Sequence, residues 1–112
     1  MELQELIDFC LSKPDSYVDL PFGDSPICIK VSNRIFAQLF PDDDKITLKC
    51  NPYLAEIYRE NYPEIVLPGY HFPNKQKKHW NTILQSSKFE KTVLKDMINH
   101  SYDEVTNKIK GK

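Results

Sequence analysis

Apolar residues recur along this chain with two different periods, and the period separates helices from strands. Near the start the spacing is that of one helix face, and its members are Leu3, Leu6, Ile7, Cys10 and Leu11. This pattern predicts a helix from about residue 2 to 13, which ends before Pro14 because a residue ahead of proline avoids the helical conformation. The stretch 13–25 has no period and holds two prolines and a glycine, which is typical of a structured loop. Its expected core anchors are Tyr17, Leu20 and Phe22.

Three segments then alternate between apolar and polar residues, at 27–32, 34–40 and 45–50. A period of two predicts strands with one buried face. The connections "SNR" and "PDDDK" are short and rich in turn formers, so the strands are expected to form an antiparallel meander. The aspartates of the second connection, Asp42, Asp43 and Asp44, are expected to lie in a solvated turn.

After the meander, Asn51 and Pro52 supply an N-cap and a first helical position, and the apolar stripe behind them predicts a helix that ends near Tyr62. Two β-rich segments, 64–72 and 79–85, flank the polar centre "PNKQKK" and predict a second hairpin.

The closing segment predicts the longest helix. Ser87 and Glu90 have the spacing of a capping box, and an apolar helical stripe runs from Phe89 to Ile109. The stripe fits either one helix of about six turns or a helix that breaks near residues 99–101, where helix propensity is lower.

The order α-β-β-β-α-β-β-α indicates an α+β fold. The expected architecture is a single two-layer domain over residues 1–112, with an antiparallel sheet of about five strands packed against helices. With 112 residues, 40% of them hydrophobic and 28% charged, the chain suits one core rather than two.

Net charge and cysteine content restrict the expected binding partners and the expected cellular compartment. The net charge is −1, so the whole molecule has no field that would draw it onto polyanions, although one face can still be basic. Cys10, Cys28 and Cys50 lack any paired spacing, which favours reduced thiols in the cytoplasm. No apolar run has the length of a membrane span or a secretion signal, so no membrane association is expected.

Catalytic and metal chemistry find little support in the sequence. Cys50 follows Lys49 and precedes a helix start, which would activate a thiol, but it shares the strand face of Leu48, which indicates burial. His71 and His79 form a close pair without the further ligands that a metal site needs. The three glycines are too scattered for a phosphate-binding loop. The sequence therefore predicts no enzyme activity, no metal and no cofactor.

The polar centre of the second hairpin holds the densest group of cations. Lys75, Lys77 and Lys78 are flanked by the aromatic residues Tyr70, His71, His79 and Trp80. Lysines neutralise phosphates and aromatic rings can stack on bases, so the segment is a candidate nucleic-acid contact. A soluble hairpin tip with core aromatics explains the same residues.

The chain resembles the MmcQ/YjbR family of small bacterial proteins over nearly its whole length. The resemblance is carried by short segments in a fixed order: "DFCLSKP" (8–14), "PFG" (21–23), "IKV" (29–31), "IFA" (35–37), "LKC" (48–50), "YP" (62–63), "PGYH" (68–71), "NK" (74–75), "HWNTI" (79–83) and "SYDEV" (101–105). It implies a compact α+β domain similar to CyaY-like or secretion-chaperone-like folds. It also implies a DNA-binding role through a double wing of two hairpins.

The sequence and the resemblance together predict a non-catalytic DNA-binding domain that contacts the phosphates of double-stranded DNA. The expected contact residues are Lys75, Lys77, Lys78, His79, Trp80, Tyr70 and His71, with Lys30, Arg34 and Lys49 as secondary candidates on the first sheet segment. The alternative is a protein-interaction or chaperone-like adaptor that binds a protein partner or a second copy of itself. No small-molecule substrate is expected.

Overall fold

The computed structural model describes residues 1–69 and 72–110, with side chains for all of these except positions 74 and 108–110. Its elements in chain order are α1 (Leu3–Leu11), β1 (Tyr17–Asp19), β2 (Ile27–Val31), β3 (Arg34–Phe40), the short 3₁₀ helix η1 (Pro41–Asp43), β4 (Lys45–Lys49), α2 (Pro52–Asn61), β5 (Val66–Pro68), α3 (Asn74–Lys77), β6 (Trp80–Leu84) and α4 (Lys91–Lys110). The predicted α+β class, the three-strand meander and the Asn51 cap of α2 are confirmed.

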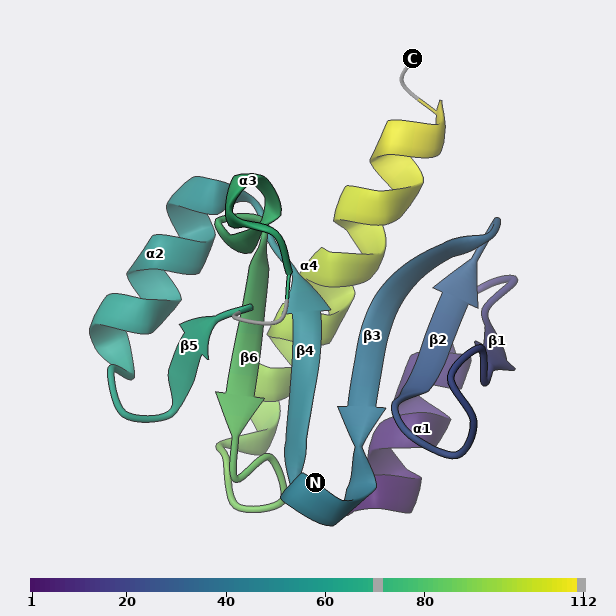
Figure 1. Ribbon diagram of the computed structural model, residues 1–112, viewed down its shortest axis with the longest axis horizontal. Coiled ribbons are helices and arrows are strands. Elements are labelled where there is room, and N and C mark those ends of the chain that lie inside the picture. Colours follow the sequence, from purple (N-terminus) through teal and green to yellow (C-terminus); the bar gives the residue numbers. More distant parts are fainter. Residues whose placement is uncertain (70–71, 111–112) are drawn as a thin grey trace.

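The strands form one antiparallel sheet in the order β1-β2-β3-β4-β6-β5 (Figure 1). β6 therefore lies inside the sheet, between β4 and β5. The sheet has six strands because β1 forms within the segment 13–25, which the sequence predicted to be a loop.

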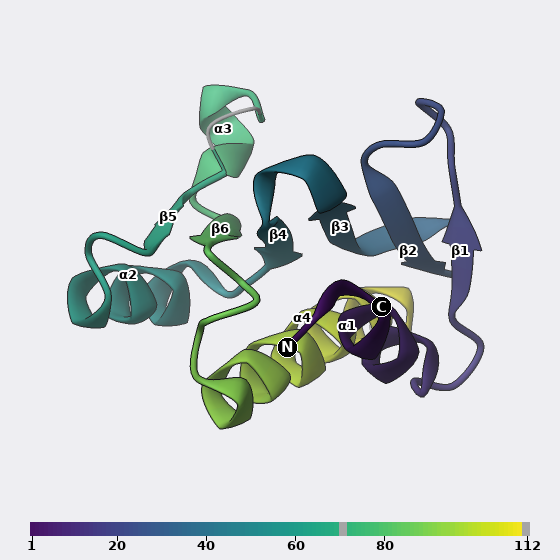
Figure 2. The same ribbon diagram turned by 90° about the horizontal axis from the view of Figure 1, so that it is seen from below.

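Helices cover mainly one face of this sheet. Figure 2 shows α1 and α4 beneath it and α3 projecting from the opposite face. α2 packs against β5 and β6. The core between sheet and helices is built from buried side chains of both layers, among them Leu6, Ile29, Phe36, Leu39, Ile46, Leu48, Ile83, Leu94, Met97 and Ile98. Burial of this apolar face is the main force that holds the two layers together.

The prediction that Tyr17, Leu20 and Phe22 are core anchors was wrong. Their exposed fractions are 38%, 47% and 67%. The reason is that β1 is a short edge strand that pairs only with β2, and the chain after it crosses the surface. An aperiodic segment gives no signal of which side chains face inward.

The second predicted hairpin is correct in its pairing but not in its tip. β5 pairs with β6 from Val66↔Ile83 to Pro68↔Asn81, and the connection contains the helix α3 instead of a β-turn. Because β6 also pairs with β4 along its whole length, this pair is an edge of the main sheet and not a free-standing hairpin.

The closing helix is continuous, so the break considered near residues 99–101 does not occur. The predicted capping box was wrong, because α4 begins at Lys91 and Ser87 has another partner. The Asp44 carboxylate accepts hydrogen bonds from the Ser87 backbone N–H (2.9 Å), the Ser87 hydroxyl (2.6 Å) and the Ser86 hydroxyl (3.2 Å). Asp44 is therefore a link between η1 and the β6–α4 connection rather than a solvated turn residue.

Protonation of Asp44 is expected to weaken this link. Hydrogen bonds from Ser87, and then from Ser86, hold the pKa of the carboxyl below its ordinary value. Because the folded pKa is the lower one, the stabilisation is complete above the unfolded pKa of about 3.9 and is lost as pH falls through the folded value. Replacing Asp44 with asparagine, which tolerates the same left-handed backbone (φ 50°), should cost about 1 kcal/mol near pH 7, after allowance for partial exposure.

Urea unfolding at neutral pH and at about pH 2 measures this effect, because the cost of Asp44→Asn should nearly vanish once the wild-type carboxyl is protonated. An equal cost at both pH values would contradict the charge-based account.

Candidate functional site

The sheet divides at one end, between β3 and β4. The two strands are paired from Phe40↔Lys45 to Ala37↔Leu48, and no pair continues toward Arg34 and Lys49. In Figure 1 the upper part of β3 bends away from β4. The register of β2 against β3 shifts at the same level, between Ile29 and Lys30. Such an irregularity increases the local twist and bend of a strand.

Ser101 of α4 occupies the point where the strands separate. Its hydroxyl donates to the Phe36 carbonyl oxygen of β3 (2.5 Å) and accepts from the Lys49 N–H of β4 (2.9 Å). The side chain has no exposed surface. One hydroxyl therefore satisfies a backbone group of each strand at the level where the strands stop satisfying each other.

A cleft of about 310 Å³ lies at this division, and we call it the split-sheet cleft. Its lining residues are Lys30, Asn33, Arg34, Ile35, Lys49, Trp80 and Val105. Five of them belong to segments that carried the family resemblance: Lys30, Ile35, Lys49, Trp80 and Val105. Segments distant in sequence are thus brought together around one concavity.

Three of the lining residues are cations and none is acidic. Lys30 forms an ion pair with Asp19 of β1 (2.6 Å), and this hydrogen bond raises the pKa of the Lys30 ammonium. The Lys49 ammonium lies 5.1 Å from the centre of the Trp80 ring, a cation–π distance. Arg34 is exposed. It follows directly on the turn residue Asn33, whose side chain and backbone N–H both hydrogen-bond the Tyr17 hydroxyl.

Trp80 is a fixed wall of the cleft. Only 7% of it is exposed. Its ring is stacked on Phe72, with centres 4.4 Å apart and planes 10° apart. Gly69 lies against the same residue, because its N–H donates to the Trp80 carbonyl oxygen (2.9 Å). Trp80 therefore shapes the site instead of presenting a free face for base stacking.

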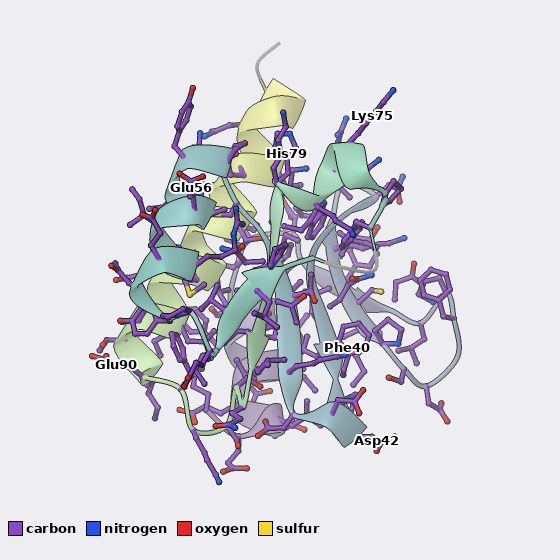
Figure 3. All side chains as sticks on the ribbon, turned by 60° about the vertical axis from the view of Figure 1, so that its left-hand side comes forward. Phe40, Asp42, Glu56, Lys75, His79 and Glu90 are labelled. Atoms are coloured by element: carbon purple, nitrogen blue, oxygen red, sulfur yellow. The ribbon has the colours of Figure 1, made fainter. Side chains whose placement is uncertain are left out.

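The lysines of the predicted tip belong to α3 and its C-cap, which come just before Trp80 in the chain. Lys75 and Lys78 are exposed and Lys77 is half-buried, and Lys78 precedes Trp80 by two residues. Figure 3 shows Lys75 and His79 at the same end of the molecule. His79 connects α3 to the rest of the fold, since its carbonyl oxygen accepts from the Cys50 N–H (2.7 Å). Tyr70 and His71 lie outside the described residues.

The structure thus places Lys30, Arg34 and Lys49 in one cleft with Trp80 as its wall, and α3 contacts β6, the strand that begins at Trp80. Sequence reasoning gave no role to Ser101 or Val105, which complete the site from α4. The segment "SYDEV" was one of those that carried the family resemblance. Only the fold shows that its serine hydrogen-bonds two strands.

Two other kinds of site were considered from the sequence, a reactive cysteine at Cys50 and a metal centre. Burial raises the pKa of the Cys50 thiol to about 12, and the negative charge of Glu104 acts in the same direction. This thiol is therefore protonated at neutral pH and a poor nucleophile. Among the described residues, no three His, Cys, Asp or Glu side chains are grouped closely enough to hold a metal ion. Within the same part of the chain, no helix is both long and apolar enough to cross a membrane.

Comparison with known proteins supports the resemblance noted in the sequence. The YjbR family model matches residues 11–104. The uncharacterised protein YjbR of Escherichia coli K12 is 26% identical over 109 residues, which cover 96% of this chain and 89% of that protein. The uncharacterised protein YbdF of Escherichia coli O157:H7 is 30% identical over 89 residues, which cover 78% of this chain and 70% of the relative.

Solved structures show the same fold. A crystal structure of the Deinococcus radiodurans protein DR2400, which carries the domain DUF419, has a TM-score of 0.84 and 29% identity, and covers 96% of this chain and 80% of that chain. A Pseudomonas syringae protein has a TM-score of 0.70 at 24% identity, with 90% of this chain and 96% of that chain covered. The second likeness concerns the fold alone.

Proposed function

The chain belongs to the YjbR family, and from this premise we propose that it is a non-catalytic domain that binds nucleic acid through phosphate contacts. The observation that carries the proposal is the gathering of cations at one end of a chain whose net charge is −1. Lys30, Arg34 and Lys49 line one cleft there, and the lysines of α3 and its C-cap come just before the cleft residue Trp80 in the chain.

The geometry favours contacts to the phosphate backbone of double-stranded DNA over sequence-specific recognition of its bases. α3 projects from the face of the sheet opposite α1 and α4 (Figure 2), so Lys75 and Lys78 can approach a duplex without hindrance from the main helices. Trp80 is buried and its ring is stacked on Phe72, so this aromatic pair of the described residues is not available for stacking on bases. Lysine ammoniums act on phosphates as point charges and carry little sequence information.

Removing the three lysines of α3 and its C-cap is expected to weaken binding and to lower its salt dependence. Each phosphate contact contributes roughly 0.9 to the slope of log K against log salt, so Lys75→Ala, Lys77→Ala and Lys78→Ala together should reduce the slope by about 3. Fluorescence anisotropy of a labelled duplex at several salt concentrations measures both quantities.

The matched control replaces Lys88, Lys91 and Lys95 with alanine, which changes the net charge equally, in the segment before α4 and in its first turns. Lys91 is an exposed residue whose ion pair with Glu5 contributes little to stability. The control should keep the wild-type slope. Wild-type protein that leaves the duplex unbound at low salt, or a variant without Lys75, Lys77 and Lys78 that binds like the wild type, would refute the proposal.

A protein-interaction role is the second candidate, and exposed apolar side chains near edge strand β1 favour it. Val18, Leu20 and Phe22 are 42%, 47% and 67% exposed, and β1 has strand pairing on one side only. An unpaired edge beside apolar side chains is suited to antiparallel pairing with a second copy of the chain. Self-association through this edge, together with a failure to bind DNA, would favour the second candidate.

A further inference from the structure

We infer that the split-sheet cleft binds the C-terminal end of a partner protein, which adds a short strand beside β3. The ligand is a peptide and not a nucleic acid, so this site goes beyond the proposed function. Three features support it: a stretch of β3 with a neighbouring strand on one side only, a cleft that closes at one end, and the charge of Arg34.

The part of β3 that borders the cleft lacks a strand on the side of β4. Arg34 and Ile35 pair with β2, whereas pairing with β4 begins only at Ala37 (Figure 1). A strand edge without a neighbour presents backbone N–H and C=O groups that another chain can bind. This edge differs from the outer edge at β1, because it lies inside the sheet and faces a concavity.

The backbone groups of Ile35 face the side without a strand. Ser32 and Asn33 connect β2 to β3 as a two-residue turn with φ values of 50° and 66°, the primed type that closes on a hydrogen-bonded pair. That pair is Val31 and Arg34. Successive residues of a strand direct their backbone groups to opposite sides, so the N–H and C=O of Ile35 are directed away from β2 and toward the cleft.

β4 does not supply the missing partner, because its continuation is bound elsewhere. The Lys49 N–H donates to the Ser101 hydroxyl (2.9 Å). The Cys50 N–H donates to the carbonyl oxygen of His79 (2.7 Å), and the chain then enters α2. The strand position beside Ile35 is therefore available to another molecule. In strand addition of this kind, main-chain hydrogen bonds give the affinity and side-chain pockets give the specificity.

The shape of the cleft favours the end of a chain over its middle. At one end of the cleft β3 and β4 resume their pairing at Ala37↔Leu48, and the Ser101 hydroxyl joins the two strands next to this pair. A peptide that enters between the strands therefore has to end there. The volume of about 310 Å³ is at the lower end of the range for small-ligand sites, which suits the last residues of a chain.

Charge decides which terminus is bound. Among the described residues that line the cleft, none is acidic. Lys30 is already paired with Asp19 (2.6 Å), but Arg34 is exposed and forms no ion pair with another described residue. A guanidinium binds a carboxylate through two parallel hydrogen bonds and repels an ammonium, so the C-terminus is favoured over the N-terminus. The apolar lining residues that its last side chain can contact are Ile35, Trp80 and Val105.

The test is a selection in which the full chain is immobilised and exposed to a library of random hexapeptides with free C-terminal carboxylates. Retained peptides should bind roughly tenfold more weakly when they are made as C-terminal amides, and Arg34→Ala should cause a similar loss for the free acids. Lys88→Ala removes one charge in the segment before α4 and is the control, which should keep the wild-type affinity. The selection contains no nucleic acid, so its outcome is separate from that of the DNA-binding test.

Backbone amide signals locate the bound peptide. In a ¹⁵N NMR titration with a retained peptide, the Ile35 N–H signal should shift and its hydrogen should exchange more slowly with solvent, because this group gains a hydrogen bond. Changes confined to the edge strand β1 would assign the peptide to that edge and overturn the inference. A library from which no peptide is retained, or amides that bind as tightly as the free acids, would overturn it as well.

Discussion

Replacing Ser101 with alanine is expected to lower the free energy of unfolding by about 2–4 kcal/mol, because a buried polar group left without a partner costs about 1–3 kcal/mol and this change affects two. The hydroxyl accepts from the Lys49 N–H and donates to the Phe36 carbonyl oxygen. No part of Ser101 is exposed, so water cannot replace these bonds unless the strands move. Urea unfolding followed by circular dichroism measures the loss.

The matched control for this prediction is Ser12→Ala. The Ser12 hydroxyl also donates to a backbone carbonyl, that of Phe9, but it lies on the surface, where water substitutes for the lost partner. Its removal should change the free energy of unfolding by less than about 0.5 kcal/mol. A loss below about 1 kcal/mol for Ser101→Ala would show that the divided sheet does not depend on this hydroxyl.

Replacing Gly69 with alanine is expected to destabilise the protein by about 1–3 kcal/mol and to alter the environment of Trp80. A Cβ atom at this position would lie 2.7 Å from the Trp80 Cβ atom and 3.0 Å from the Phe72 ring. The Trp80 Cβ is fixed to a central strand and cannot move aside, so the Gly69 N–H···O bond to Trp80 must lengthen or the Phe72 stack must shift.

Tryptophan emission and urea unfolding together measure this effect. Gly23→Ala is the control, since its Cβ would meet nothing within 4 Å but its φ of +96° strains any other residue. It should cost about 1 kcal/mol through the backbone and leave the emission of Trp80 unchanged. Unchanged emission in Gly69→Ala would contradict the steric explanation of this glycine.

The helices and central strands were predictable because each has a local signal. The alternation of β2, β3 and β4 and the stripes of α1 and α2 follow from burial of one face, and this repeats within a few residues. The cap at Asn51 is equally local, since its side chain accepts from the Tyr53 and Leu54 N–H groups. Asp44, in contrast, looked like a turn residue, because its partners Ser86 and Ser87 lie about forty positions later.

The sequence by itself determined the α+β class and the position of most elements, and it supplied the cations on which the proposed phosphate contacts depend. Tertiary structure alone decided that β6 lies between β4 and β5, that β3 and β4 separate beside Ser101, and that Lys30, Arg34 and Lys49 share one cleft. The physical reason is that periodicity reports only whether a residue faces the core. Which distant residues meet depends on strand order and on a few long-range hydrogen bonds, and these leave no local pattern in the sequence.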